Sequence, residues 1–210
     1  MRTRVTYIFS LIFLFTSQLN AEVIRVDNKH QRLWNQFADK ALALHKKQIK
    51  KYPHQKATKI GGYGNLPDFY LEEIYRATSH GKVLSKVTWE KEQPKNLHTI
   101  EVFVYDEQSR MVRDYSAAYL PSYRSAPTQT LLTLHTYNKG VHAMRTFDAS
   151  ADHILDKCVG KFAEDDINIL LDEDELHQAR YEYDSILESD AYLHCFKGMP
   201  EKPGKFLPPG

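Results

Sequence analysis

Four aspartates in two matched segments are the first candidates for chemistry. The segments YDEQSRMVRD (residues 105–114) and FDASADHILD (147–156) align without a gap: an aromatic residue, an Asp, a short polar run, an aliphatic residue and a second Asp. Paired carboxylates hydrolyse glycosides when a fold holds them at a fixed separation with different pKa values. The candidates are Asp106, Asp114, Asp148 and Asp156.

The first Asp of each segment also has a sufficient structural role. Asp favours the first position of a type I turn, because its side chain accepts a backbone N–H two residues on. The fourth turn position commonly takes Gly, but Ser109 and Ala151 stand there. We expect either a mildly costly left-handed conformation at these two residues or longer loops. We favour this turn interpretation over catalysis.

The aromatic–Asp–turn pattern resembles the single hairpin of YD-type repeats. Two copies without the glycine do not make the chain a member of that family. The copies begin at residues 105 and 147, and two further strands are predicted between them. This spacing indicates reuse of one turn rather than a solenoid.

Histidines offer a second kind of chemistry, metal binding. The chain has ten, and His135 and His142 flank the turn residues Asn138, Lys139 and Gly140. With Gly140 as the bulge residue of a three-residue loop, the two His point to opposite faces of the hairpin. With a two-residue Lys139–Gly140 turn they share one face, diagonally placed. The first register suits the glycine better, so we predict no metal site.

Other cofactor and nucleophile signatures are incomplete. The glycines within 61–67 lack the Lys-Ser/Thr of a Walker loop and the preceding strand of a dinucleotide site. The acidic runs 164–166 and 172–175 lack EF-hand spacing, and no GxSxG motif occurs. We predict no cofactor, and we interpret residues 61–67 as a loop.

The first 21 residues have the layout of a bacterial secretory signal. Arg2 and Arg4 precede an apolar run at 7–15, and Ala21 is a small residue at the expected cut. We predict a signal peptide at 1–21, a single globular domain at 22–210, and a periplasmic or secreted protein. The apolar run is too short for a confident membrane span, so the mature chain is not expected to span one. An uncleaved anchor is the alternative.

Two cysteines, Cys158 and Cys195, are the whole thiol content. In an exported chain without a CxxC motif, an isolated pair is most simply a disulfide. It would close a loop of about 38 residues, worth on the order of 3–4 kcal/mol in the chain-entropy model.

The elements that would position these residues form an α+β fold. Apolar residues that recur four and three positions apart predict a helix at 28–51, and a second helix is predicted from 172 to about 188. Between them, alternation and turn signals predict an antiparallel up-and-down meander of about seven strands, a half-barrel or barrel. A Pro/Gly-rich tail from about 197 is expected to be irregular. The predicted strands are 69–78, 83–90, 97–105, 110–117, 129–137, 141–147 and 153–160.

The longest interruption of the meander, residues 113–130, is the predicted binding surface. Tyr offers an apolar face with a polar tip, and Arg offers a planar donor fork, while long loops on rigid sheets often carry function. A lid over the sheet core is the alternative role for these side chains. The predicted ligand- or partner-binding residues are Arg113, Tyr115, Tyr119, Tyr123 and Arg124.

Composition limits the class of function. The chain is 42% apolar and 26% charged, close to the average of globular proteins. A net charge of +1 gives no case for nucleic acid. We predict a non-enzymatic binding or accessory protein that engages a protein or an envelope component. The alternatives are an envelope hydrolase with spatially assembled residues such as Asp114 and His135, and a periplasmic metal-handling protein.

Overall fold

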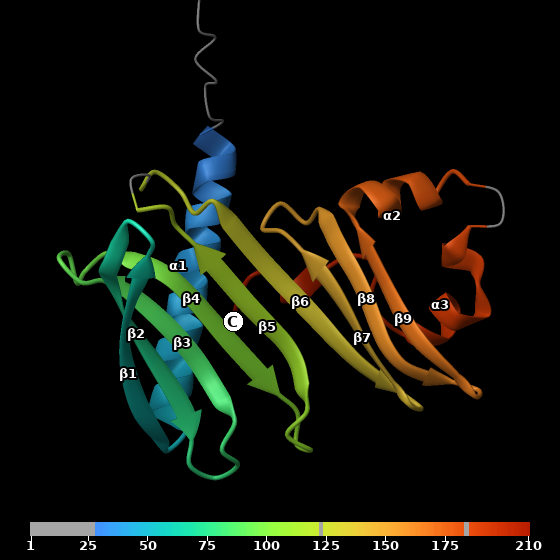
Figure 1. Ribbon diagram of the computed structural model, residues 1–210, viewed down its shortest axis with the longest axis horizontal. Coiled ribbons are helices and arrows are strands. Elements are labelled where there is room, and N and C mark those ends of the chain that lie inside the picture. Colours follow the sequence, from blue (N-terminus) through green and yellow to red (C-terminus); the bar gives the residue numbers. More distant parts are fainter. Residues whose placement is uncertain (1–27, 122–123, 183–184) are drawn as a thin grey trace, which may run out of the picture.

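The fold is an open, nine-stranded antiparallel sheet with helices near both ends of the chain (Figure 1). The computed structural model describes residues 28–121, 124–182 and 185–210, so the predicted signal peptide and Tyr123 lie outside it. Each strand pairs with the next in sequence, from β1 to β9. The elements are α1 (Asn28–Lys51), β1 (His54–Tyr63), β2 (Leu66–Ala77), β3 (Val83–Glu90), β4 (Leu97–Tyr105), β5 (Met111–Ala118), β6 (Gln129–Asn138), β7 (Val141–Phe147), β8 (His153–Phe162), β9 (Asp165–Asp172), α2 (Glu173–Ala179), α3 (Asp190–Cys195) and the 3-10 turns Ile186–Glu188 and Gly204–Phe206.

The up-and-down meander predicted from alternation is confirmed, and the sheet stays open instead of closing into a barrel. The sheet has two strands more than the seven predicted, β1 and β9, and both are edge strands. The segment 61–67, interpreted as a glycine loop, lies mostly in strands: β1 takes residues 61–63 and β2 takes 66–67, so only Gly64 and Asn65 form the turn. Seven of the ten residues of β1 are exposed and none is buried. An edge strand of this kind has no buried face, and therefore no alternation to reveal it.

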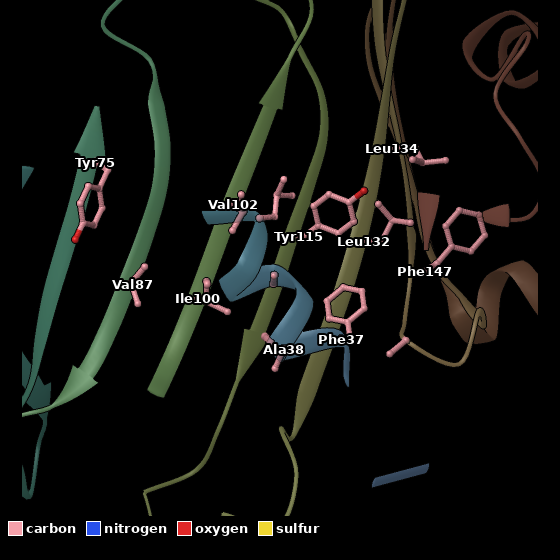
Figure 2. Packing of buried hydrophobic residues seen from close by; sticks show 14 residues of the cluster. Phe37, Ala38, Tyr75, Val87, Ile100, Val102, Tyr115, Leu132, Leu134 and Phe147 are labelled. Carbon is pink, nitrogen blue, oxygen red and sulfur yellow. The ribbon is translucent and has the colours of Figure 1, made fainter. Parts of the chain in front are cut away.

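The predicted helix at 28–51 is confirmed as α1, which lies across one face of the sheet (Figure 1). Ala41 is fully buried and Ala38 nearly so, which lets the helix approach β3–β6 closely. Phe37 packs beside Tyr115 at the centre of this core (Figure 2). The principal buried residues are Phe37, Ala38, Ala41, Leu44, Tyr75, Val87, Ile100, Val102, Tyr115, Leu132, Leu134 and Phe147.

A second core fills the space between β7–β9 and the C-terminal helices. It includes Ala143, Leu171, Leu176 and the Cys158–Cys195 disulfide, which confirms the predicted pairing. Among the helices of the described residues, none is long and apolar enough to cross a membrane.

The second predicted helix begins where expected but ends early. Asp172 and Glu175 form a reciprocal capping box at the start of α2. The prediction of one helix to about 188 is wrong, because α2 ends at Ala179. Ser185 instead donates a hydrogen bond to the carbonyl of Ala179 and accepts one from the N–H of Leu187. Such serine–backbone bonds compete with a continuous helix.

Both cores lie on the same face of the sheet. Leu134 stands opposite Arg145, and Ala143 and Arg145, two residues apart on β7, point to one side. The tail also returns to this face, where Phe206 and Leu207 pack against the first core. Side chains that alternate with the core residues lie on the opposite side, which we call the open face.

Candidate functional site: a basic pocket beside a buried ion-pair network

A cavity of about 590 Å³ lies between the β7–β8 hairpin and the C-terminal helices. Apolar side chains of α2, α3 and the tail, including Leu176, Phe196 and Met199, form part of its wall. Its charged lining residues are Arg145, His153, Arg180, Lys197, Glu201 and Lys202. The lining thus combines an apolar wall with several cations and one carboxylate, and we call this cavity the basic pocket.

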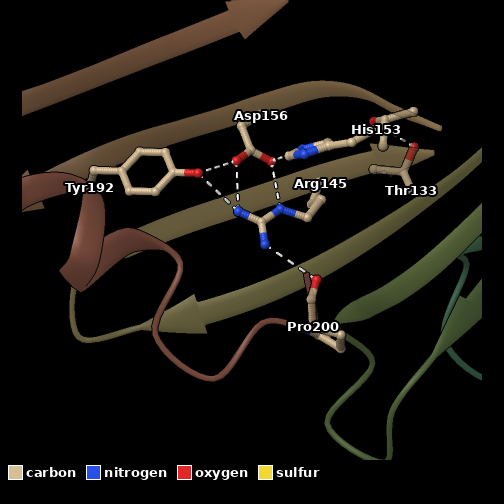
Figure 3. A network of polar contacts seen from close by, with 7 residues as sticks. Thr133, Arg145, His153, Asp156, Tyr192 and Pro200 are labelled. Atoms are coloured by element: carbon tan, nitrogen blue, oxygen red, sulfur yellow. Dashed lines mark hydrogen bonds and ion pairs between the residues drawn. The ribbon is translucent and has the colours of Figure 1, made fainter. Parts of the chain in front are cut away.

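A buried network of polar side chains borders this cavity (Figure 3). Arg145 of β7 stands opposite Asp156 of β8 in the strand register. Its Nε and Nη2 atoms donate to the two carboxylate oxygens of Asp156 at 2.8 and 2.7 Å. This two-point geometry is the strongest form of Arg–carboxylate pairing. Arg145 Nη1 also donates to the carbonyl of Pro200 at 3.2 Å, which ties the tail to the sheet.

Two further side chains complete the network around Asp156. His153 Nε2 donates to one carboxylate oxygen at 2.8 Å, and the Tyr192 hydroxyl donates to the other at 2.6 Å. Burial alone would raise the pKa of Asp156, but the hydrogen bonds from Arg145, His153 and Tyr192 hold it below its usual value. Burial, followed by the bond to Asp156, raises the pKa of Tyr192.

This chemistry suits binding rather than proton transfer. Asp156 accepts four hydrogen bonds, so the four lone-pair sites of its carboxylate are occupied. A general acid needs a raised pKa, which is the opposite of the shift at Asp156. The network therefore holds Arg145, His153 and Tyr192 in fixed positions at the cavity wall.

The remaining cations of the cavity have no ion-pair partner among the described residues. Arg180, Lys197 and Lys202 are exposed, and their side chains form no ion pair within residues 28–121, 124–182 and 185–210. Among the described residues that line the cavity, Glu201 is the one acid. Cations around a partly apolar cavity would attract a carboxylate or a phosphate.

The loop predicted as a binding surface contributes mainly to the core. Tyr115 is 1% exposed and donates to the carbonyl of Phe206. Tyr119 donates to Asn35 of α1 at 3.2 Å, and the guanidinium of Arg113 lies 4.8 Å from the Phe206 ring centre. These three side chains are therefore engaged with α1 and the tail.

Arg124, the fourth of the predicted binding residues that the structure describes, pairs with Glu90 and donates to the carbonyl of Leu97 at 3.0 Å. These contacts are with strand ends, whereas the contacts of Tyr115 and Tyr119 are with the tail and α1. The loop residues are thus not brought together in one pocket. A binding role for the loop stays a prediction.

The four aspartates of the matched segments do not converge either. Asp106 and Asp148 each accept two backbone N–H bonds in their turns. In a meander, the β4–β5 and β7–β8 turns fall at opposite ends of the sheet. Asp114 and Asp156 point to opposite faces, since Asp114 aligns through Thr133 with Thr146 and Asp156 pairs with Arg145. No pair of carboxylates among these four is placed for glycoside hydrolysis.

The preferred register of the β6–β7 hairpin is wrong. Asn138 pairs with Val141 and Tyr137 with His142, which leaves a two-residue Lys139–Gly140 turn. Gly140 has a φ of 91°, so it uses its conformational freedom inside the tighter turn. The consequence is that His135 and His142 share the open face.

Sequence analysis missed Arg145, Arg180, Lys197 and Lys202. The signal at Arg145 was present in the strand pattern, because pairing 141–147 with 153–160 across a short turn places Arg145 near Asp156. The cations of α2 and the tail carry no local pattern. They meet Arg145 only through the fold of the C-terminal segment.

No protein-family model matches the chain, and no curated protein matches it. Among solved structures, the chain is similar to a DUF3836 family protein from Parabacteroides distasonis at 14% sequence identity. That match covers 60% of this chain and 95% of the other, with a TM-score of 0.24. A likeness at this level carries no argument about function.

Proposed function

We propose that the chain is an exported, non-enzymatic binding protein that takes an anionic group of a protein or envelope component into the basic pocket. The observation that carries the proposal is the set of Arg180, Lys197 and Lys202 around a cavity of about 590 Å³. A carboxylate or phosphate would supply the negative charge that these cations lack within the described chain.

The buried network supports a binding role. Arg145 and Tyr192 are held by Asp156 before any ligand arrives. A wall whose side chains are already fixed lowers the entropy lost on binding. The apolar wall formed by Leu176, Phe196 and Met199 would contact the carbon skeleton that bears the anion.

Two observations support export. The N-terminal segment has the layout of a secretory signal, and the Cys158–Cys195 disulfide is of the kind that persists in oxidising compartments. A reporter fusion of residues 1–30 would test the first directly. Retention of the reporter in the bacterial cytoplasm would contradict export, but it would not bear on anion binding in the pocket.

The pocket is tested by calorimetric titration of the purified mature chain. The probes are inorganic phosphate, an oligogalacturonate and a neutral oligosaccharide of equal length. We expect binding of an anionic probe that weakens as salt increases, and no binding of the neutral one. Replacing Arg180, Lys197 and Lys202 together by Gln should lower the affinity for the anionic probe at least about tenfold, which corresponds to about 1.4 kcal/mol of binding free energy.

The matched control removes the same charge elsewhere. Lys46, Lys47 and Lys50 are exposed on α1, so replacing them by Gln changes the net charge equally without touching the pocket. Equal losses of affinity for the anionic probe in the two triple variants would show that the probe is attracted by net charge and not by the pocket. Equal affinity for the neutral and the charged oligosaccharide would contradict an anion site.

A further inference from the structure

His135 and His142 meet edge to edge on the open face of the sheet. His135 Nδ1 lies 2.9 Å from His142 Nε2, and the ring centres are 5.2 Å apart. The centre-to-centre distance equals the N···N distance plus one ring radius on each side. The facing nitrogens are therefore aimed at each other, and the rings do not lie one above the other.

Asp114 sets the tautomer of His135. Its Oδ2 accepts from His135 Nε2 at 2.7 Å, so the proton of this ring belongs on Nε2 and a lone pair is left on Nδ1. A carboxylate behind an imidazole is the usual support of a metal-ligating histidine. The His135 side chain is 7% exposed and that of Asp114 22%, so this arrangement is shielded from water.

Met144 supplies a third donor on the same face. It stands directly opposite His135 in the strand register and two residues beyond His142 on β7. Directly opposed residues have Cβ atoms about 4.5–5.5 Å apart, which places the thioether within reach of both imidazoles.

We propose that His135, His142 and Met144 form a binding site for monovalent copper, with Asp114 orienting His135. Imidazole suits several transition metals, whereas a thioether selects Cu(I). Zinc prefers three or four His, Cys or carboxylate ligands, and the hard cations prefer six or more oxygen ligands. Within the described part of the chain, no group of three such residues has metal-binding geometry.

Binding requires a small opening of the pair and a tilt of each ring, because the facing nitrogens now point at each other and not at a common metal position. Two nitrogens held at about 2.0–2.1 Å on one tetrahedral metal lie about 3.3 Å apart, a few tenths of an ångström beyond the present distance. His142 then loses its Nε2 proton to solvent and gains one on Nδ1, so the net charge of the ring is unchanged.

The site is reached from the turn end of the hairpin. An opening of about 330 Å³ there is lined by Tyr137, His142 and Val159 together with the turn residues. The Tyr137 ring stacks on His142 at 4.5 Å with planes 7° apart, which covers one side of that imidazole. The site lies on the face opposite the basic pocket and is independent of the proposed anion binding.

The test is an anaerobic competition titration of the mature chain with Cu(I) bicinchoninate. We expect one Cu(I) per chain, lost in His135→Ala and His142→Ala. Met144→Leu should weaken binding at least about tenfold, and Asp114→Asn by about 10–100-fold. His80→Ala and His177→Ala remove exposed histidines elsewhere and should leave affinity and stoichiometry unchanged.

The wild-type chain gives a second readout that needs no variant. In an NMR spectrum of the histidine rings, one equivalent of Cu(I) should shift the His135 and His142 signals and leave those of His80 and His177 in place. Shifts at other histidines instead, an unchanged affinity in Met144→Leu, or zinc binding as tight as Cu(I) would each overturn the proposal.

Discussion

Arg145 and Asp156 form a two-point ion pair across β7 and β8 in which the side chains are 5% and 0% exposed. Asp156→Asn would leave the guanidinium buried without its counter-charge. Loss of one partner of a buried pair costs about 3–5 kcal/mol. We expect that decrease in the free energy of unfolding, measured by urea denaturation.

The chain contains a matched control for this pair. Lys86 and Glu101 also stand directly opposite each other, on β3 and β4, but their side chains are 35% and 40% exposed. Exposed pairs contribute about 0–1 kcal/mol, so Glu101→Gln should have little effect. Similar losses in Asp156→Asn and Glu101→Gln would show that burial of the Arg145 pair is not what matters.

The disulfide gives a second prediction, on the C-terminal segment. Replacing Cys158 and Cys195 together by Ser should lower the free energy of unfolding by about 3–4 kcal/mol, from the entropy of a loop with a sequence separation of 37. Because α3 and the tail carry part of the basic pocket, limited proteolysis should first cut beyond Ala179 in this variant. Two reactive thiols in the denatured, unreduced wild-type protein would contradict the pairing.

The parts of the fold that sequence analysis recovered are those with a buried face. α1 and the strands β3, β4 and β7 have the predicted bounds, and each contributes buried residues to one of the two cores. The exposed edge strand β1 has no such contrast. The break after Ala179 depends on single hydrogen bonds of Ser185, which a periodicity of apolar residues does not register.

The candidate sites were harder to predict, because they depend on register and on distant segments. A shift of one residue in the β6–β7 turn decides whether His135 and His142 share a face. Arg180 and Lys202 meet at the pocket only because α2, α3 and the tail fold back on β7 and β8. The composition of residues 113–130 predicted a binding surface, yet the hydroxyls of Tyr115 and Tyr119 are hydrogen-bonded to the tail and to α1.

The matched turns give a third prediction, on two strained residues. Ser109 and Ala151 have φ values of 59° and 74°, a region where side chains cost free energy and glycine does not. Ser109→Gly and Ala151→Gly should each raise the free energy of unfolding by about 0.5–1 kcal/mol. Ala57→Gly, at an exposed site in β1, should lower it by a similar amount. Destabilisation at all three positions would contradict turn strain.

The last prediction concerns the pH dependence of stability through His45. This α1 side chain faces the sheet, where its Nδ1 is hydrogen-bonded to Ser85 of β3 at 2.7 Å, and burial lowers its pKa from 6.5 to about 4. The unfolded chain therefore binds the proton more readily than the folded chain. Stability from this group is complete above pH 6.5 and is lost as the pH falls towards 4.

The expected loss over that window is about 3 kcal/mol, at 1.36 kcal/mol per pKa unit. Burial also raises the pKa of the Asp148 carboxyl, so the measurement compares two proteins to isolate His45. The difference between the wild-type and His45→Gln unfolding free energies should decrease steadily from pH 7 to pH 4. His177→Gln, at an exposed position, should keep a constant difference. A flat difference for His45→Gln would mean that the folded chain protonates this ring as readily as the unfolded chain does.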